Sequence, residues 1–452
     1  MSLRRNYLSG LESVAQTVGV LAPAGTIGVI LPLLIGKTGN GTWLMFLAVA
    51  GIFLLIACNI AVFARRHASA GGLASFVRLG LGPRWGVAAG WVYVGAMLFG
   101  AASAAPAAAY YGALFIARLT GLPNTPLLNV VVNDAVVAAA WWTAYRDIKL
   151  SSDVMIVVES SSLALMAAIL LLAAAHSGTW IDRPQLTLQG AGLPGFSAGL
   201  VLAFLTMGGF ESAATLGEES RHAETTIPRI ILGTVLPVAV LYLAATYLLV
   251  GLGRKFGLSL DQLDAPFDTL ARADGAPVLG LVSSLGIAMS FLACTLGSIN
   301  AGARTLYSLA QEGAFFASFG RTHPANRTPH RGIALLAVVA IAAPTLLLFA
   351  DMPTVSVVDN LSQLAALGYI GSYFLVCLAA PFYLASQGRL RWGGLAVAVA
   401  ALLLLGLVMG QSVFPVPPAP ARYLPYVFLG TVAAGFCISR ALERRRWAGK
   451  AA

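Results

Sequence analysis

The sequence is poor in charged residues. It has 452 residues, of which 28 are Lys or Arg and 18 are Asp or Glu. Charged residues therefore make up 10% of the chain, whereas soluble domains carry about 25%. Hydrophobic residues make up 58%, and the mean hydropathy is +0.82. This composition leaves too little polar surface for a water-soluble enzyme, so it excludes the cytosolic globular classes and indicates a polytopic membrane protein.

Residues that carry redox, metal or phosphate chemistry are also scarce. The four cysteines all lie in apolar blocks without a C-x-x-C pair, which is typical of small core residues. The five histidines lie mostly at block ends and are not spaced like metal ligands, and there is no G-x-x-x-x-G-K-[ST] phosphate loop. We therefore expect no enzyme activity, no cofactor and no metal. Any transport would have to draw on a gradient or on a partner protein.

Long hydrophobic runs fill most of the chain. A membrane-spanning helix needs about 20 mostly apolar residues. Twelve blocks approach that length, and none alternates like a β-barrel strand. The blocks cover residues 13–36, 41–64, 86–117, 126–145, 154–176, 196–217, 228–251, 276–300, 332–350, 355–384, 392–412 and 423–440. The sequence therefore predicts an all-α protein with twelve transmembrane helices.

The basic residues are divided unevenly between the two ends of these helices. If the N-terminus is cytoplasmic, 21 of the 28 Lys and Arg residues lie on the cytoplasmic side. Because Lys and Arg are enriched in cytoplasmic loops, we expect both termini to be cytoplasmic and the protein to cross the inner (cytoplasmic) membrane of a bacterial-type cell. The net charge of +10 is then a topology signal. It predicts contact with the lipid bilayer and none with nucleic acid.

Two of the blocks, the first and the sixth, contain residues that interrupt helices. The first contains APAGTIGVILP, residues Ala22–Pro32, and the sixth contains FLTMGGFES, residues Phe204–Ser212. Unpaired backbone inside a membrane is tolerated only where it lines a cavity or is buried in protein. The two breaks are five blocks apart, as an inverted five-helix repeat would place them, and such pairs mark substrate sites near the membrane midplane. The alternative is a packing kink in each helix.

Three stretches resemble one family of carriers. GGFES with GEES and IPR behind it (Gly208–Arg229) looks like helix 6 of the amino acid–polyamine–organocation (APC) permeases. GGLASFVRLGLGPRWGVAAGW (Gly71–Trp91) is similar to their loop into helix 3, and ARTLYSLAQEGAFFASFGRTHPANRTPHRG (Ala303–Gly332) is similar to the end of their helix 8. The resemblance implies a LeuT-type fold in one domain, residues 1–450. Its inverted repeats would cover 13–176 and 196–384, with two further helices in 392–440. It also implies alternating-access secondary transport of amino acids or related amines.

The two breaks predict a site for a zwitterion. The N–H groups of the second half of helix 1, around Thr26, Ile27 and Gly28, suit a substrate carboxylate, because a helix N-terminus is the positive end of its dipole. The free carbonyls of helix 6 suit an ammonium group. This sequence has GTIGV where the family commonly has G-[ST]-G-I-F, which leaves the register of the first break open. The predicted substrate-binding residues are Ala24, Gly25, Thr26, Ile27, Gly28, Phe204, Thr206, Met207, Gly208, Gly209 and Phe210.

The roles of the two phenylalanines and of three carboxyl groups have alternatives. Phe204 and Phe210 either gate the substrate or simply pack in the core. Glu211 follows the helix 6 break, and we expect it to brace that break or to take part in proton coupling. Glu159 in block 154–176 is the main candidate for a titrating group, because removal from water disfavours a charged carboxyl. Its alternative is a carboxyl satisfied by Ser160–Ser162 or by another helix. For Asp134 a packing role is expected.

Two coupling ions remain open at this point. Some proton-coupled relatives carry a lysine on helix 5 in place of a sodium site, and this chain has no such lysine. A sodium site would need oxygen ligands from helix 1 and helix 8, for which Ser290, Thr295 and Ser298 are the candidates, although hydroxyls in membrane helices usually bond the preceding turn.

The predicted function is a permease that moves an amino acid or related amine, coupled to protons or by exchange. The alternatives are a sodium-coupled carrier, a transporter of a polyamine or other organic or inorganic cation on the same fold, and a channel. A channel would need a hydrophilic stripe or charged ring along several helices, and no block shows one.

Overall fold

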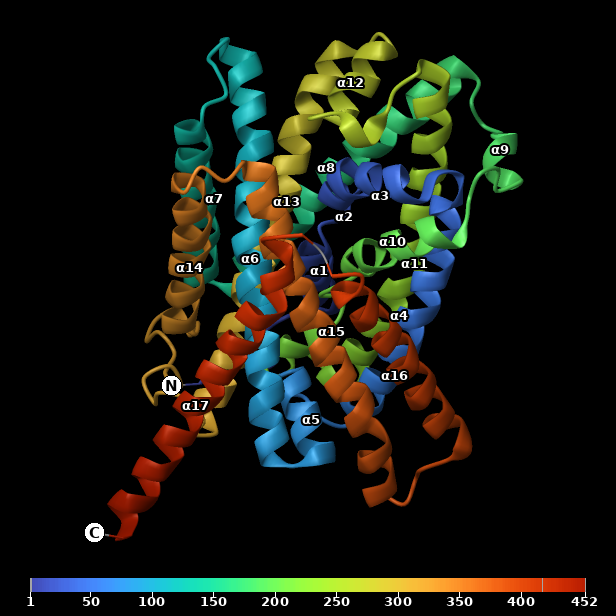
Figure 1. Cartoon of the computed structure of the whole chain (residues 1–452). Coiled ribbons are helices and arrows are strands. Elements are labelled where there is room, and N and C mark those ends of the chain that lie inside the picture. The colour runs from blue at the N-terminus through green and yellow to red at the C-terminus, as the bar shows by residue number, and fades with distance from the viewer. Residues whose placement is uncertain (1, 417, 452) are drawn as a thin grey trace.

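The computed structural model describes residues 2–416 and 418–451, and it is built from helices (Figure 1). The main helices are α1 (Gly10–Leu21), α2 (Pro23–Gly25), α3 (Leu31–Thr38), α4 (Thr42–Ala64), α5 (Leu73–Leu81), α6 (Pro83–Thr120), α7 (Pro126–Arg146), α8 (Ile148–Ser177), α9 (Arg183–Leu186), α10 (Leu193–Leu205), α11 (Ala223–Phe256), α12 (Pro266–Ala273), α13 (Pro277–Gln311), α14 (His330–Phe349), α15 (Thr354–Ser386), α16 (Trp392–Val413) and α17 (Leu424–Ala451). One isolated parallel bridge joins Leu8 to Ser220. The predicted all-α polytopic class is confirmed.

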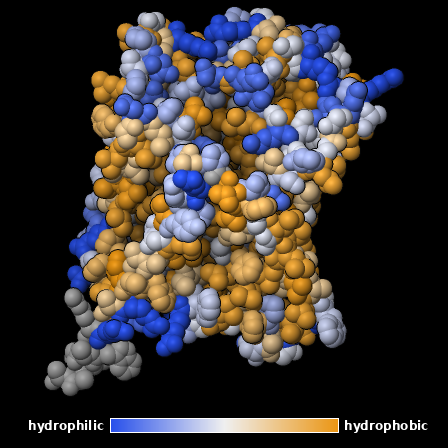
Figure 2. Space-filling view, viewed as in Figure 1, coloured by the Kyte–Doolittle hydropathy of each residue, from blue (hydrophilic) through white to orange (hydrophobic). Residues whose placement is uncertain are grey.

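Ten helical segments of the described chain are long and apolar enough to cross a membrane. The first of them, Gly10–Ala64, covers 55 residues and contains two of the predicted blocks, 13–36 and 41–64. The predicted block 196–217 contains only the 13-residue α10 and a short 3-10 turn. The count of twelve therefore stays a prediction. Figure 2 shows hydrophobic residues over most of the side of the molecule, as expected of a surface that faces lipid.

The centre of the molecule is formed by α6, which packs against α13 and against α15 (Figure 1). Small residues make this close packing possible. Gly368 of α15 lies against the backbone of Ala96 on α6, and Gly302 of α13 lies against Met97. Helices in membranes associate through such small residues because they let the backbones approach. Of the wall formed by these three helices, α13 contacts α1, α2 and the segment Ser212–Leu216, and α15 contacts α10.

Helix 1 is interrupted at one residue. α1 ends at Leu21, Ala22 has a left-handed backbone (φ 42°), and α2 begins at Pro23. Residues Thr26–Ile30 then form a π-helical turn. The second half of helix 1 therefore begins at Pro23, and the expectation that it begins around Thr26–Gly28 is wrong by three residues or more. Proline fits the first position of a helix because that position needs no N–H donor.

Helix 6 is interrupted over a longer stretch. α10 ends at Leu205, and residues 206–211 form turns in which Gly209 has φ 92°, a conformation that favours glycine. A 3-10 segment, Ser212–Leu216, follows. The second half of this helix is thus short and is not an α-helix.

One end of the molecule is held together by ion pairs and by the N-terminal segment, residues 3–9. We call this end of the molecule the N-terminal face. Glu219 and Arg304 are both fully buried there, and Arg304 Nε donates to Glu219 Oε2 at 2.5 Å. The N–H groups of Tyr7 and Leu8 donate to the carbonyl of Glu219 at 2.7 and 2.9 Å. Arg4 pairs with Asp147 at 2.6 Å. These contacts tie the chain after helix 6 to α13 and to the N-terminus.

We expect the substitution Arg304→Met to lower the melting temperature of the purified protein strongly, because it leaves the Glu219 carboxylate buried without its partner. Loss of one member of a buried ion pair costs about 3–5 kcal/mol. The double variant Arg304→Met/Glu219→Met should recover most of the loss, since it leaves no unpaired charge. Arg5→Met, at an exposed arginine, is the control. Equal melting of the Arg304→Met and Arg5→Met variants would show that the pair contributes nothing.

Candidate functional site

The two interrupted helices meet in the interior. The Thr17 hydroxyl on α1 donates to the carbonyl of Phe210 at 3.2 Å, and the Ser212 hydroxyl donates to the carbonyl of Gln16 at 3.2 Å. A Cβ on Gly209 would overlap the side chain of Val20. Glycine at 209 therefore serves both the turn and the approach of helix 1, so that the ends of α1, α2 and α10 lie around one buried point.

The positive end of α2 is occupied by side chains of the protein itself. The Ala24 N–H donates to Glu159 Oε1 at 2.7 Å, and the Gly25 N–H donates to Ser290 Oγ at 2.9 Å. The Ser290 hydroxyl in turn donates to Glu159 Oε2 at 2.7 Å. Glu159 is 1% exposed. A carboxyl group of α8 thus sits where the sequence predicts a substrate carboxylate, and its partners come from other helices and not from Ser160–Ser162.

The negative end of α10 is only partly occupied. The Tyr242 hydroxyl of α11 donates to the Thr206 carbonyl at 3.3 Å. Within the described residues, the carbonyl oxygens of Met207 and Gly208 accept no hydrogen bond. The sequence predicts free carbonyls near Thr206, Met207 and Gly208. The Thr206 carbonyl is taken, and the role of the other two toward an ammonium group stays a prediction.

Glu211 is connected to the break by a tyrosine. The Gly209 N–H donates to the Tyr373 hydroxyl at 2.9 Å, and this hydroxyl donates to Glu211 Oε2. Glu211 Oε1 and the Tyr93 hydroxyl are buried next to each other and interact, although no well-formed hydrogen bond joins them within the described residues. This geometry fits the bracing role considered for Glu211.

The two phenylalanines of the predicted gate are packed in the core, whereas the predicted sodium ligands lie on α13. Phe204 and Phe210 are fully buried and pack against Phe53, with ring centroids 4.8 and 5.3 Å from it. The Thr295 hydroxyl donates to the carbonyl of Phe291 at 2.9 Å, so it serves its own helix. Of the sodium candidates, only Ser290 reaches helix 1.

Asp134 lies away from the two breaks. It is half-buried on α7 and accepts a hydrogen bond at 3.3 Å from the neighbouring Asn133.

Several residues at the site were not predicted from the sequence. They are Tyr93, Tyr242, Cys294, Tyr369 and Tyr373. Each is a polar or polarisable residue within an apolar block, but that signal alone does not say which helix it faces.

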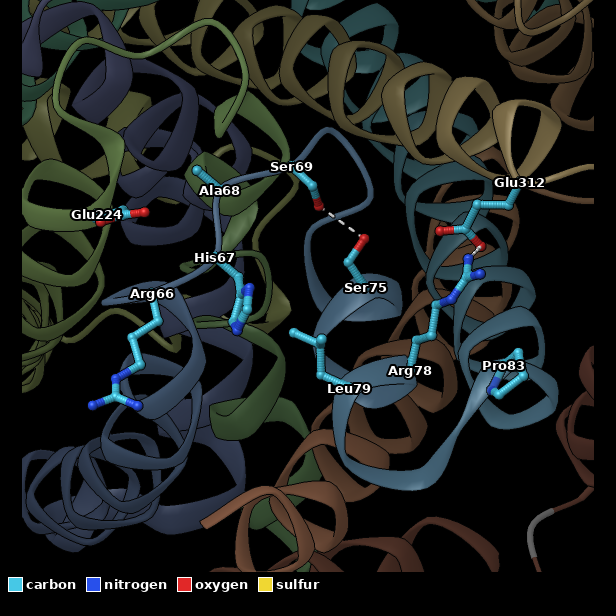
Figure 3. A pocket seen from close by; sticks show the side chains of 10 residues that line it. All are labelled: Arg66, His67, Ala68, Ser69, Ser75, Arg78, Leu79, Pro83, Glu224 and Glu312. Atoms are coloured by element: carbon cyan, nitrogen blue, oxygen red, sulfur yellow. Dashed lines mark hydrogen bonds and ion pairs between the residues drawn. The ribbon is translucent and has the colours of Figure 1, made fainter. Parts of the chain in front are cut away.

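A surface hollow of about 700 Å³ lies elsewhere, among α5, the loop before it and the ends of neighbouring helices (Figure 3). Arg78 pairs with Glu312 in it, and the Ser69 hydroxyl donates to that of Ser75 at 2.8 Å. Burial raises the pKa of the Glu312 carboxyl, and Arg78 opposes this shift. The hollow is lined by residues of neither helix break, so it is not part of the site.

Comparison with known proteins gives one matching family model and several curated relatives. The model of a family described as amino acid permease matches residues 8–435. A branched-chain amino acid permease of Lactococcus lactis subsp. cremoris is 30% identical over 44% of this chain and 40% of its own length. An uncharacterized transporter of Mycobacterium tuberculosis is 27% identical over 75% of this chain and 74% of its own. An L-methionine/branched-chain amino acid exporter of Escherichia coli is 25% identical over 90% of this chain and 94% of its own.

We expect Tyr373→Phe to lower the melting temperature more than Tyr93→Phe. The first substitution removes a hydroxyl that accepts from Gly209 and donates to Glu211, leaving both buried groups unpaired at a cost of about 1–3 kcal/mol each. The second removes a hydroxyl that interacts with Glu211 without a well-formed hydrogen bond and that bonds no backbone group of the break among the described residues. Thermal unfolding of both variants beside the parent protein checks this. The reverse order would mean that Tyr93, and not Tyr373, holds the helix 6 break.

Proposed function

Because the chain belongs to the amino acid permease family, we propose that it is a secondary carrier that moves an amino acid across the cytoplasmic membrane by alternating access. The chain is a multi-pass membrane transporter, and the family match confirms the resemblance to the APC permeases. Two relatives are named for branched-chain amino acids, one as a permease and one as an exporter, so amino acids are the proposed substrates.

One observation carries the proposal: two helix ends of opposite polarity face the same buried point. The N-terminal end of α2 favours an anion and the free carbonyls of Met207 and Gly208 favour a cation. A free α-amino acid carries both charges, a carboxylate and an ammonium group on one carbon. It therefore neutralises both helix ends at once, which a simple amine does not.

Glu159 gives this site a means of coupling to protons. Its carboxyl group occupies the Ala24 N–H and, through Ser290, the Gly25 N–H. A substrate carboxylate needs the same helix end, and two carboxylates at one end repel each other. Protonation of Glu159 removes that repulsion, so a proton and a substrate bind together. This linkage is reciprocal, because each ligand raises the affinity for the other by the same factor.

The alternatives have less support from the geometry. A sodium ion needs several oxygen ligands, but Thr295 bonds its own helix and Ser290 is engaged by Gly25 and Glu159. A polyamine or other cation needs a free carboxylate, but both oxygens of Glu159 and one of Glu211 already accept hydrogen bonds.

The proposed carrier has two inverted repeats, residues 13–176 and 196–384, and cytoplasmic termini. The N-terminal face would then be the cytoplasmic one. It is closed by the Glu219–Arg304 and Arg4–Asp147 pairs, so release of substrate into the cytoplasm requires these pairs to separate.

The proposed function is tested with purified protein in proteoliposomes. We expect saturable uptake of a labelled amino acid, uptake that accelerates when unlabelled substrate is preloaded inside, and no change when choline replaces sodium. Uptake that requires sodium would replace the proton by sodium as the coupling ion. Flux that neither saturates nor shows counterflow would indicate a channel.

We expect Glu159→Gln to abolish uptake driven by a pH gradient while leaving exchange intact, because the neutral amide mimics the protonated carboxyl throughout the cycle. In the parent protein, substrate affinity should fall as pH rises, since the deprotonated Glu159 competes with the substrate. In the variant it should stay high at all pH values, with a difference of about tenfold at high pH, within the range typical of coupled sites. Binding and uptake measured between pH 5 and 9 test this.

Asp134→Asn is the matched control for Glu159→Gln. It also neutralises a carboxyl within a spanning helix, but one that touches neither break. It should keep the pH dependence of the parent. Proton-driven uptake by Glu159→Gln at the parent rate would rule out Glu159 as the coupling group.

A further inference from the structure

Two hydroxyl groups beside the site make no hydrogen bond within the described residues. One is the buried Ser298 hydroxyl of α13. The other is the hydroxyl of Tyr369 on α15, a residue that is 5% exposed and for which only ring and electrostatic contacts are found. Both face Gly100 of α6. A Cβ on Gly100 would lie 3.3 Å from Ser298 Oγ and 3.6 Å from the Tyr369 hydroxyl oxygen. We call these three residues the Gly100 notch.

The Gly100 notch adjoins both helix breaks. The ring of Tyr369 lies against Gly208, and its hydroxyl oxygen would be 3.2 Å from a Cβ on Gly209. On the other side, Ser298 lies beside the Cys294 thiol. That thiol donates to the carbonyl of Val20, two residues before the helix 1 break, at 3.1 Å. A molecule held between the breaks is therefore in reach of the notch.

None of the three residues of the Gly100 notch carries a charge. Glu211, the carboxyl group with which Tyr369 interacts electrostatically, lies between the hydroxyls of Tyr373 and Tyr93. The buried cation on α13, Arg304, is paired with Glu219. What the notch offers is two hydroxyls, each able to donate and to accept. Buried polar groups without partners are rare in folded proteins, and the Ser298 hydroxyl is one of them.

We propose that the Gly100 notch binds a hydroxyl or amide group on the side chain of the substrate. The carrier then prefers small neutral polar amino acids, such as threonine, serine and asparagine, to apolar ones of the same shape. This inference rests on the proposed function. The α-carboxylate and α-ammonium of the substrate are taken by the ends of α2 and α10, so the side chain is the part that points at the wall formed by α6, α13 and α15. Because residue 100 is glycine, no Cβ lies in front of the two hydroxyls and the substrate side chain can approach them.

Threonine and valine provide the test, because they have the same shape and differ by one hydroxyl. A site built to hydrogen-bond a substrate hydroxyl discriminates strongly against the analogue that lacks it, since its own polar groups are left unpaired. We expect the purified parent protein to bind threonine at least about tenfold more tightly than valine. Titration calorimetry, or stabilisation of the protein by each amino acid, measures this ratio.

Two variants test whether Ser298 and Tyr369 cause the preference for threonine over valine. Ser298→Ala and Tyr369→Phe should each weaken threonine binding by about tenfold and change valine binding little. The melting temperature of the unliganded protein should not fall, because neither hydroxyl holds the fold together. Ser284→Ala is the matched control: Ser284 is also a buried, unpartnered serine of α13, but it lies about four turns away. This variant should keep the preference for threonine.

The outcomes separate the two proposals. Valine binding as tightly as threonine to the parent, as the names of two relatives would suggest for this chain, overturns the assignment of the notch and leaves the carrier intact. Equal weakening of both ligands in the variants also overturns it, because the hydroxyls would then contact the α-groups. A lower melting temperature with unchanged selectivity would show that a buried water fills the notch. If no amino acid binds or is transported, the proposed function itself fails.

Discussion

A helix that is interrupted inside a membrane leaves backbone groups without partners where no water can reach them, and the centre of this protein is arranged around that constraint. The break at Ala22 exposes the N–H groups of Ala24 and Gly25, and the break after Leu205 exposes carbonyls. Side chains from four other helices supply partners. Glu159 comes from α8, Tyr242 from α11, Ser290 from α13 and Tyr373 from α15.

The type of side chain at each break follows from the polarity of the helix end. The start of α2 presents N–H donors and positive potential, so an acceptor such as a carboxyl group is stable there. A lysine at position 159 would place donors against donors, and it would have to turn to the carbonyls at the end of α1 instead. The glutamate is therefore a ligand of the second half of helix 1. In the proposed coupling, a change in the charge of Glu159 acts directly on this helix end and so on the affinity for an anion.

Much of the fold was predictable from the length of the apolar blocks and from the positions of Gly and Pro within them. Apolar blocks of about 20 residues predict the spanning helices, and Gly and Pro in the first and sixth blocks predict the two breaks. The register of the first break was missed although Pro23 was a usable signal, because proline favours the first position of a helix. The left-handed Ala22 carried no signal, since glycine normally takes that conformation.

The side chains that bond the backbone at the two breaks could not be predicted from the sequence. Tyr242, Tyr369 and Tyr373 look alike in sequence, as aromatic residues in apolar blocks. Tyr242 donates to a carbonyl of helix 6, Tyr373 bonds a backbone N–H and a carboxyl group, and Tyr369 makes no hydrogen bond within the described residues. These differences arise from how α11 and α15 pack, and no local pattern encodes such packing. The same holds for Glu159 and Ser290, which are 131 residues apart in the chain and 2.7 Å apart in space.

The distribution of unpaired polar atoms bears on how such a site can open. Gln16 Oε1, Ser298 Oγ and the side-chain nitrogen of Asn300 are buried without partners, and they lie on α1 and α13 between the breaks and the N-terminal face. Each such group costs about 1–3 kcal/mol while it stays dry. Separation of the buried Glu219–Arg304 pair costs several kcal/mol as well, but it admits water to these groups. The two terms oppose each other and are of similar size. The structure is therefore stabilised by a buried ion pair and destabilised by dry polar groups. In the proposed carrier, this balance would let the closed and the hydrated, open state both be populated.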